Sequence, residues 1–353
     1  MKVKRSFILT WRNALKNFFP PFLFNFLRIL YKKLSFLLED MFSGLNYLLL
    51  FPLNLSYKKK KRYLFCFKRL GIGDALIISS VINHYKSKGK LILITNEQKV
   101  YRNMGVKEII LKNNIFSNLF ISFLTLSFHS NIIGVFGDFQ STSKKSKEKK
   151  HYRFSLFAKR KDILREFKNF SPNPRIVFSE TEQIKFSKKY KQIISSNYGV
   201  ISAGSYFNGF PTVKNVSLFK IQQTVDKTQD KIKWIQTGTK DEPDLKNTLD
   251  LRGIPLRETF FIVKNAKIVV TTEGMLTQLA GAFDIPCVTI CTGFIYPESS
   301  KYKSTFFVQP RPLPDCAYCW DHICKKTGTS IAECEKQVSS KDIISLVKKV
   351  INL

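Results

Sequence analysis

The order in which apolar runs, glycine turns and helical stretches follow one another limits the folds open to this chain more than any other feature. From residue 62 onward, short apolar runs such as "RYLFCF", "KLILIT" and "KIVVTT" alternate with stretches of helical period, and glycine follows several of these runs. Strands that alternate with helices form parallel sheets covered on both faces, because each crossover lays a helix on the sheet. The pattern predicts an α/β fold with two Rossmann-like domains facing a cleft.

This pattern occurs twice, which sets the predicted domain boundaries. The first half is expected at residues 62–196, and a polar, heavily basic stretch at 141–161 interrupts it. The strand in "YGVISAG" starts a second half at 197–335, and a capped amphipathic helix is expected within 336–353. Ligands of open α/β sheets bind outside the carboxyl ends of the strands. We therefore expect the glycine turns at those ends to line the site.

The first 61 residues have a different character from the rest. Residues 1–61 mix Phe, Leu and Trp with Lys and Arg, and they run into the basic cluster "KKKKR". A membrane-spanning helix needs about 20 apolar residues without charge. Charges interrupt every window up to residue 38, and the uncharged window 41–57 is short. We expect a basic amphipathic extension lying on an anionic membrane surface, with a helical extension packed on the globular body as the alternative.

The net charge indicates an anionic partner. The chain has 58 Lys and Arg against 26 Asp and Glu, a formal charge of +32. Such an excess suits nucleic acid, an acidic leaflet or a phosphorylated substrate. The sequence has no zinc-finger, RRM or helix-turn-helix pattern, and its basic runs are interleaved with Phe and Leu. A nucleic-acid-binding protein is therefore the weaker interpretation, and no nucleic acid partner is expected.

Two glycines and a carboxylate follow the first predicted strand. In "RLGIGDAL" these residues are Gly71, Gly73 and Asp74. Glycine lets a backbone approach a substrate closely, and a carboxylate there could act as general base or as N-cap of a helix at 74–87. Leu76 stands where the third glycine of a dinucleotide fingerprint would fall, and no acidic residue stands clearly about 20 residues on. A dinucleotide site is therefore disfavoured.

The segment "VKNAKIVVTTEGMLTQLAGAFDIPCVTICTG" at 263–293 resembles the C-terminal signature of glycosyltransferase family 9, the lipopolysaccharide heptosyltransferase family. The likeness lies in the Glu273-Gly274 loop, in the helical run that begins at Leu279, and in the strand and turn that end at Gly293. The "AGS…VKNVS" and "GTKDE" stretches resemble the lysine loop and the acidic turn of the same family. The turn before Asp74 resembles its Gly-Asp turn, so four matches stand in family order.

Two departures from the family pattern bear on acceptor choice and activity. Gln278 stands where the family usually has histidine, and Val216-Ser217 replaces Trp-Pro after the lysine. A homologue that binds a nucleotide sugar or a glycan without turnover is therefore the alternative to an active enzyme.

The resemblance implies a GT-B fold and an inverting glycosyltransferase that moves a sugar, heptose from ADP-heptose, onto a lipopolysaccharide-core or related lipid-linked glycan. It gives Asp74 the role of base, Lys214 that of contacting the leaving diphosphate, and Glu242 that of binding the ribose. The other substrate-binding candidates are Gly71, Gly73, Gly204, Ser205, Glu273, Gly274, Met275 and Gln278. No cofactor is expected for catalysis, because a lysine and helix amides can stabilise the leaving group.

The expected partners are a nucleotide-sugar donor, an anionic or phosphorylated glycolipid acceptor and an anionic membrane surface. The sequence has no convincing signal peptide, so the expected location is cytoplasmic, at the cytoplasmic face of a bacterial inner membrane.

A cysteine cluster near the C-terminus allows more than one interpretation. Cys316, Cys319, Cys324 and Cys334 stand close together in the sequence. Four thiols could bind Zn²⁺ as a structural site, and the first pair has zinc-ribbon spacing, whereas the second pair does not. Disulfide or redox pairing and unlinked thiols are the alternatives.

Overall fold

The computed structural model describes residues 62–67, 71–86, 90–95, 98–110, 132–135, 173–207, 210–319 and 323–352. Arg62–Ile110 and Ile133–Leu353 make up one compact unit, which contains both sheets. The predicted membrane-associating extension at 1–61 and the basic stretch at 141–161 lie outside the described residues.

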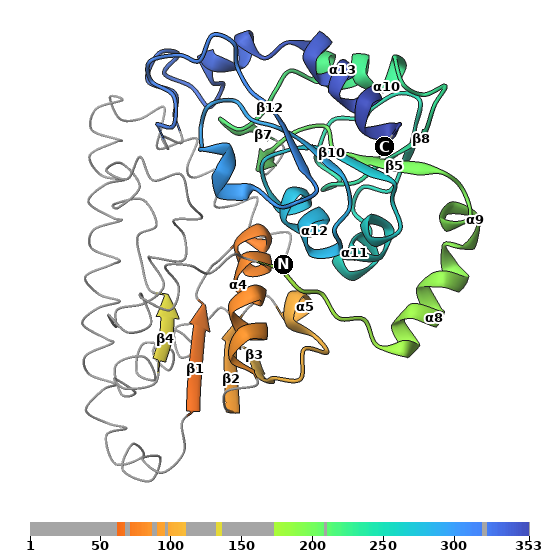
Figure 1. The fold of residues 1–353 in the computed structure, drawn as a ribbon, viewed down its shortest axis with the longest axis vertical. Coiled ribbons are helices and arrows are strands. Elements are labelled where there is room, and N and C mark those ends of the chain that lie inside the picture. Colours follow the sequence, from red (N-terminus) through yellow and green to blue (C-terminus); the bar gives the residue numbers. More distant parts are fainter. Residues whose placement is uncertain are drawn as a thin grey trace, which may run out of the picture. The chain divides into compact units, whose positions relative to one another are not determined.

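The first sheet has four strands, and all of them lie within the first predicted domain, residues 62–196 (Figure 1). Its strands are β1 (Arg62–Phe67), β2 (Lys90–Thr95), β3 (Lys107–Ile110) and β4 (Ile132–Val135). Their order is β3-β2-β1-β4, and β1, β2 and β3 run parallel. Helix α4 (Ile72–Tyr85) follows β1, and the short α5 (Gln98–Tyr101) follows β2. The strands predicted from "RYLFCF" and "KLILIT" are thus present.

The second sheet has six strands, and all of its neighbouring strands pair in parallel. They are β5 (Tyr198–Ile201), β8 (Lys233–Gln236), β9 (Thr248–Asp250), β10 (Ile268–Thr272), β11 (Cys287–Ile290) and β12 (Thr305–Val308). The order β12-β11-β10-β5-β8-β9 is the doubly wound order of a Rossmann sheet. A small hairpin of β6 (Tyr206–Phe207) and β7 (Phe210–Pro211) follows β5.

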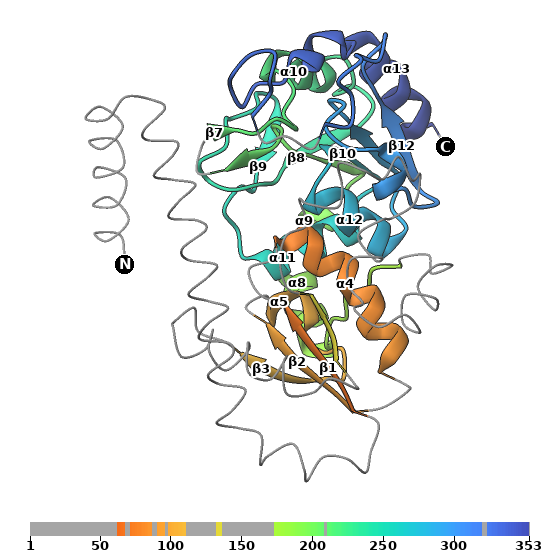
Figure 2. The same cartoon turned by 90° about the vertical axis from the view of Figure 1, so that its left-hand side faces the viewer.

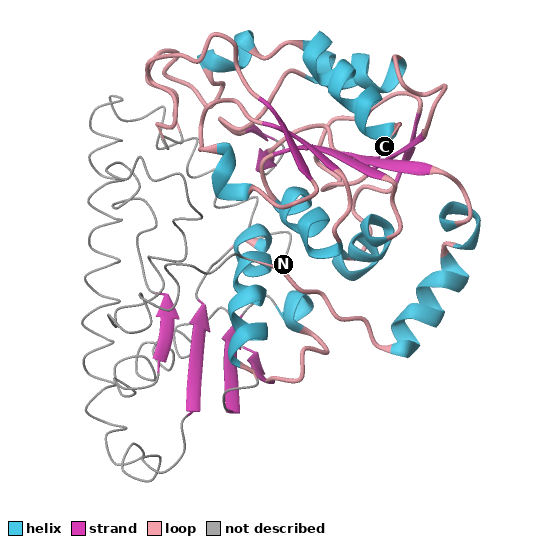
Figure 3. Ribbon diagram, viewed as in Figure 1, coloured by secondary structure: helices cyan, strands magenta, loops and turns pink. Residues whose placement is uncertain are grey.

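Helices cover both faces of this second sheet (Figure 3). They are α10 (Leu218–Asp226), α11 (Leu256–Lys264), α12 (Met275–Phe283) and α13 (Ser340–Ile351). Successive residues of β10 point to opposite faces: Val269 packs in the core with α11 and α12, whereas Ile268 and Val270 pack in the core with α10 and α13. The predicted α/β class with helix-covered parallel sheets is confirmed.

The core beneath α11 and α12 continues into the first half of the chain. Ala75 and Ile82 of α4 share that core with Leu279 of α12, and Figure 2 shows the two helices side by side. Along the chain, α8 (Glu180–Lys189) and α9 (Lys191–Ile194) come between β4 of the first sheet and β5 of the second.

Two 3₁₀ turns, Pro297–Ser300 and Glu333–Gln337, complete the second half. The C-terminal helix α13 begins as predicted, with the Ser339 hydroxyl accepting from the Asp342 amide. None of the helices in the described part of the chain is long and apolar enough to cross a bilayer. The domain boundaries at 61, 196 and 335 stay predictions.

Candidate functional site

The strand order of the second sheet reverses between β5 and β10, and this places the candidate site. The chain leaves β5 toward β8 on one side, and it leaves β10 toward β11 on the other. Open α/β sheets bind ligands outside the carboxyl ends of the strands at such a point. The residues that follow β5 include Gly204 and Ser205, and those that follow β10 are Glu273, Gly274 and Met275. The topology therefore brings these five predicted residues to one edge of the sheet.

The structure excludes one of the two roles predicted for Asp74, that of N-cap residue. Helix α4 begins at Ile72, because Gly71 is the extended N-cap residue and its carbonyl accepts from the Ala75 amide at 3.0 Å. Asp74 lies in the first helical turn and is not the cap, so the expected helix start at 74 was wrong. A carboxylate in this turn interacts favourably with the positive end of the helix dipole.

The first turns of α4 and α12 are in contact at a glycine. A Cβ atom built on Gly73 would lie 3.4 Å from the Met275 amide nitrogen and 3.5 Å from the Gly274 carbonyl carbon. The absence of a side chain at Gly73 thus allows the close approach of the two backbones. Gly71 and Gly274 are the N-cap residues of these helices, and no side chain makes a capping hydrogen bond at either position. The Gly71–Asp74 turn and the Glu273–Met275 turn are therefore parts of one site.

Lys214 and Glu273 form the main ion pair of this edge. The Lys214 ammonium donates to Glu273 Oε2, with 24% of the lysine side chain and 4% of the glutamate side chain exposed. The Ser300 hydroxyl donates to the other carboxylate oxygen at 3.1 Å. The ammonium also lies 5.4 Å from the ring centroid of Phe294. The pairing offsets the repulsion that a carboxylate at this position would exert on a diphosphate.

Asn215 organises the loop that carries Lys214. Its Oδ1 accepts from the Ser205 amide at 2.9 Å and would lie 1.8 Å from a Cβ on Gly204, where φ is +140°. Only glycine fits at 204 for both reasons. The amide of Ser205, one of the predicted substrate-binding residues, is thus used inside the loop. Asn215 was missed, although it stands beside the predicted lysine in "VKNVS".

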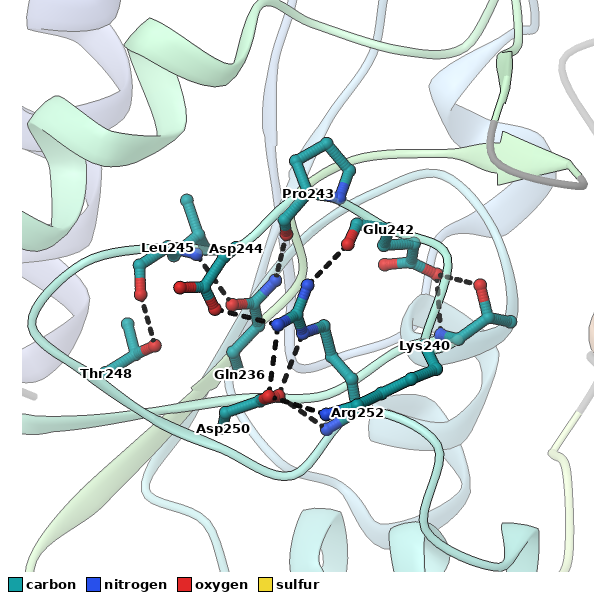
Figure 4. A network of polar contacts seen from close by, with 10 residues as sticks. Gln236, Lys240, Glu242, Pro243, Asp244, Leu245, Thr248, Asp250 and Arg252 are labelled. Atoms are coloured by element: carbon teal, nitrogen blue, oxygen red, sulfur yellow. Dashed lines mark hydrogen bonds and ion pairs between the residues drawn. The ribbon is translucent and has the colours of Figure 1, made fainter.

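Glu242 folds back over the turn that follows β8 (Figure 4). Its Oε1 accepts from the Thr239 amide at 2.9 Å, whereas its Oε2 is buried without a hydrogen-bond partner among the described residues. Burial raises the pKa of the Glu242 carboxyl, and the Thr239 hydrogen bonds oppose this rise. Gly238 has φ +152°, and a Cβ there would lie 2.2 Å from Oε2.

Arg252 holds this turn through hydrogen bonds to three residues around it, Asp250, Asp244 and Glu242 (Figure 4). It donates to Asp250 through Nε at 2.8 Å and through Nη2 at 3.0 Å, and it reaches Asp244 at 2.8 Å. Its Nη1 donates to the backbone carbonyl of Glu242. Gln236 holds the same loop, donating to the Pro243 carbonyl and accepting from the Leu245 amide. Arg252 and Gln236 were not predicted from the sequence, because their role depends on how the loop folds back.

The sequence matches no protein-family model and no curated protein. Solved structures nevertheless superpose over most of the chain. A family 9 glycosyltransferase from Veillonella parvula DSM 2008 does so with a TM-score of 0.58 and 11% identity, over 83% of this chain and 97% of that one. For E. coli ADP-heptose lps heptosyltransferase II the TM-score is 0.57 at 12% identity, over 82% and 98%. For the iron-containing dodecameric glycosyltransferase TibC of enterotoxigenic E. coli H10407 it is 0.59 at 14%, over 83% and 77%.

This chain has the fold of the family 9 glycosyltransferases. The predicted resemblance to that family and the predicted GT-B fold are thus confirmed at the level of the fold.

Gln278 occupies an inward position in this family 9 fold. It is 1% exposed, its Nε2 donates to Ser300 Oγ at 3.2 Å, and its Oε1 accepts from the Tyr302 hydroxyl. Both ends of its amide are therefore engaged by protein groups. Ser300 and Tyr302 were missed by sequence reasoning, because they lie far from Gln278 in sequence and carry no motif of their own.

The cysteine cluster does not form a metal site in the part of the fold that is described. Cys316, Cys319, Cys324 and Cys334 form no disulfide among the described residues. No group of three or more His, Cys, Asp or Glu among the described residues could hold a metal ion. A structural zinc, one of the alternatives considered for this cluster, therefore has no ligand set there, and the iron of TibC is a property of that protein.

Proposed function

We propose that this chain is an inverting glycosyltransferase that transfers a sugar from a nucleoside-diphosphate donor, heptose from ADP-heptose, onto a lipopolysaccharide-core or related lipid-linked glycan. The observation that carries the proposal is the contact between the Asp74 turn and the Met275 turn, beside the Lys214–Glu273 pair. It combines a carboxylate, a cation and two helix N-termini, which are the groups that such a transfer requires.

The donor assignment rests on polar groups beside the second sheet and on a solved structure with a similar fold. The buried Glu242 Oε2 lacks a hydrogen-bond partner among the described residues and could accept from a ribose hydroxyl. Lys214 and the first amides of α12 could meet the oxygens of a diphosphate. TibC, in a structure that superposes with a TM-score of 0.56 at 15% identity, was solved with ADP-D-β-D-heptose.

The reaction assigns one task to each group. Asp74 takes the proton from the acceptor hydroxyl, and the acceptor oxygen forms a bond to the anomeric carbon on the face opposite the diphosphate. The bond from that carbon to the diphosphate oxygen breaks, and the electron pair leaves with the diphosphate. Lys214 and the α12 amides stabilise the charge that develops on this leaving group. Attack from the opposite face inverts the anomeric centre.

The proposed location is the cytoplasmic face of a bacterial inner membrane. Its support is the sequence of residues 1–61 and of the basic stretch 141–161, which combine cations with apolar side chains. Co-sedimentation with phosphatidylglycerol vesicles and with neutral phosphatidylcholine vesicles tests it. Salt-sensitive binding to the anionic vesicles alone is expected, whereas binding to duplex DNA and to neither vesicle would contradict it.

A thermal-shift screen against ADP-, GDP- and UDP-sugars tests the donor claim. Stabilisation by one nucleotide class is expected, with ADP-heptose as the strongest ligand. If no nucleotide sugar raises the melting temperature, the proposed function falls.

The base assignment needs a turnover measurement at saturating donor. Asp74→Asn is expected to lower kcat by at least about a hundredfold, because general base catalysis contributes on this scale. Asp230→Asn, at an exposed position, is the matched control and is expected to keep wild-type turnover. Unchanged kcat in Asp74→Asn would remove Asp74 from the mechanism.

A further inference from the structure

A line of buried polar side chains runs from the Lys214–Glu273 pair into the protein. Ser300 donates to Glu273 Oε1 at 3.1 Å, Gln278 Nε2 donates to Ser300 Oγ at 3.2 Å, and the Tyr302 hydroxyl donates to Gln278 Oε1. Ser300 and Gln278 are each 1% exposed, and Tyr302 is 9% exposed. The line joins α12 to the segment that leads into β12, so its order depends on tertiary structure.

The direction of every bond in this line follows from its end at Glu273. A carboxylate ion can only accept, so Ser300 must donate its one hydroxyl proton to Glu273. The Ser300 oxygen can then only accept, which requires the amide nitrogen of Gln278 on that side. The amide oxygen of Gln278 must face Tyr302, whose hydroxyl donates to it. A side chain that donates at one end and accepts at the other is therefore required at 278.

The outer end of the line is the cation of the candidate site. Glu273 is held through both oxygens, Oε2 by Lys214 and Oε1 by Ser300. Two donors on different oxygens fix the plane of the carboxylate. The fixed carboxylate holds the ammonium of Lys214 in place, and Lys214 is the more exposed member of the pair. In the same way, Gln278 fixes the hydroxyl of Ser300, and Tyr302 fixes the amide of Gln278.

We propose that Ser300, Gln278 and Tyr302 are positioning residues that orient Glu273, and through it Lys214, toward the diphosphate of the donor. The inference rests on the proposed function. It assigns a role inside the protein to Gln278, which stands where the resembled family usually has histidine. Substrate contact is left to Lys214, and the three positioning residues act through Glu273.

The test compares ligands that differ only in the diphosphate. Binding of ADP, GDP and UDP, and of the matching nucleosides, is measured by calorimetry on the full chain. Ser300→Ala is expected to weaken binding of the preferred nucleoside diphosphate about tenfold, because it removes a hydrogen bond to a charged group. Tyr302→Phe is expected to weaken it about threefold, since that bond is neutral and more remote. Nucleoside binding should not change in either variant.

The double variant distinguishes a connected line from independent packing effects. Once Ser300 is replaced, Tyr302 has no route to Glu273 through this line. Ser300→Ala with Tyr302→Phe should therefore bind the nucleoside diphosphate as weakly as Ser300→Ala alone. Losses that add, losses that affect the nucleoside equally, or unchanged affinities would each overturn the inference.

Tyr198→Phe is the matched control for loss of a buried tyrosine hydroxyl. Its hydroxyl donates to the Ile262 carbonyl at 2.7 Å, at the other end of β5 from the site. Both affinities should stay at the wild-type level. If Ser300→Ala does not fold, the isosteric Tyr302→Phe alone decides, by the same comparison of diphosphate and nucleoside. Failure of the wild type to bind any of the three diphosphates would instead count against the proposed function.

Discussion

Arg257 of α11 holds Glu182 of α8 through both carboxylate oxygens, with Nε–Oε1 at 3.1 Å and Nη2–Oε2 at 2.8 Å. The arginine side chain is 7% exposed and the glutamate side chain 11%. The same guanidinium donates to the carbonyls of Val177 and Lys99. One side chain thus fastens α5, the segment before α8, and α8 itself to the second half of the chain.

We expect Glu182→Gln to destabilise the protein by about 3–5 kcal/mol, because it leaves the buried guanidinium of Arg257 without its counter-charge. Unfolding in urea, followed by circular dichroism, measures the change. Glu180→Gln removes a carboxylate from the same helix at an exposed position and should cost less than about 1 kcal/mol. Equal losses in the two variants would show that the pair does not stabilise the fold.

The same pair predicts a pH dependence. Burial acts to raise the pKa of Glu182, but the hydrogen bonds from Arg257 and from the Ser179 amide outweigh it, so the pKa lies below its ordinary value of 4.5. A carboxyl with a lowered folded-state pKa adds stability above its unfolded-state pKa and loses this stability as the pH falls through its folded-state pKa. The stability gap between wild type and Glu182→Gln should be full at pH 7 and shrink below about pH 4. A gap that widens in acid would contradict this assignment.

Gly238 keeps the space that the Glu242 carboxylate occupies. Gly238→Ala would place a Cβ 2.2 Å from Glu242 Oε2 on a backbone with φ +152°. We expect the carboxylate to be displaced and nucleotide affinity to fall at least about tenfold, which corresponds to about 1.4 kcal/mol. Calorimetry with the nucleotide that stabilises the wild type measures this loss.

Gly105→Ala is the matched control for the strain of a positive φ without a collision. Gly105 has φ +74°, and a Cβ there would meet nothing within 4 Å. This variant should be destabilised by about 1 kcal/mol and should keep its nucleotide affinity. Equal affinity losses at positions 105 and 238 would mean that strain, and not the displacement of Glu242, is the cause.

The cysteines should differ in their rates of alkylation. Burial tends to raise the pKa of the Cys324 thiol, but backbone N–H groups, including that of Glu333, more than offset this and lower it. Burial raises the pKa of Cys334 to about 11 and that of Cys287 to about 12, and it also raises that of Cys291. The thiolate is the reactive form.

At pH 7.5, iodoacetamide should therefore modify Cys324 at least about tenfold faster than Cys334. Cys287 and Cys291 should react only after unfolding, because both side chains are buried. Mass spectrometry of digested samples taken over time gives the rates. A faster reaction at Cys334 than at Cys324 would show that the N–H groups do not stabilise the Cys324 thiolate.

Local patterns and long-range contacts differ in how far the sequence predicts them. Helix α12 (Met275–Phe283) contains the helical run expected from Leu279, because an apolar helical run between a strand and a new strand leaves few alternatives. Strand β12 was not predicted, since "TFFV" is too short for periodicity to distinguish it from a buried loop. The motif residues Lys214 and Glu273 were identified through the resemblance to the family motifs, but their pairing was not predicted.

The groups that hold the motif residues in place were the least predictable part of the candidate site. Asn215, Ser300 and Arg252 act through contacts that depend on how loops fold back or on which segments meet. A short polar side chain in a loop has no periodicity, so its partner cannot be read from spacing alone. The sequence therefore indicates which residues could do the chemistry, and the tertiary structure determines what orients them.

Arg252 and Lys240 both bind Asp250. The two ion pairs differ in exposure, so the effect of a buried cation can be compared with that of an exposed one at the same carboxylate. The arginine side chain is 9% exposed and binds the carboxylate through two nitrogens while also holding the Glu242 carbonyl. The lysine side chain is 70% exposed and makes one contact, at 2.9 Å. Arg252→Lys removes the planar fork, which an ammonium cannot replace, so Glu242 should lose its fixed position.

We expect Arg252→Lys to weaken nucleotide binding about tenfold, measured by calorimetry with ADP, GDP and UDP. Lys240→Gln removes the exposed ion pair and should change neither affinity nor stability by more than about 1 kcal/mol. If Lys240→Gln weakened binding as much as Arg252→Lys, the charge at Asp250 would matter and the brace on Glu242 would not. Retention of wild-type affinity in Arg252→Lys would likewise exclude Arg252 from positioning the turn.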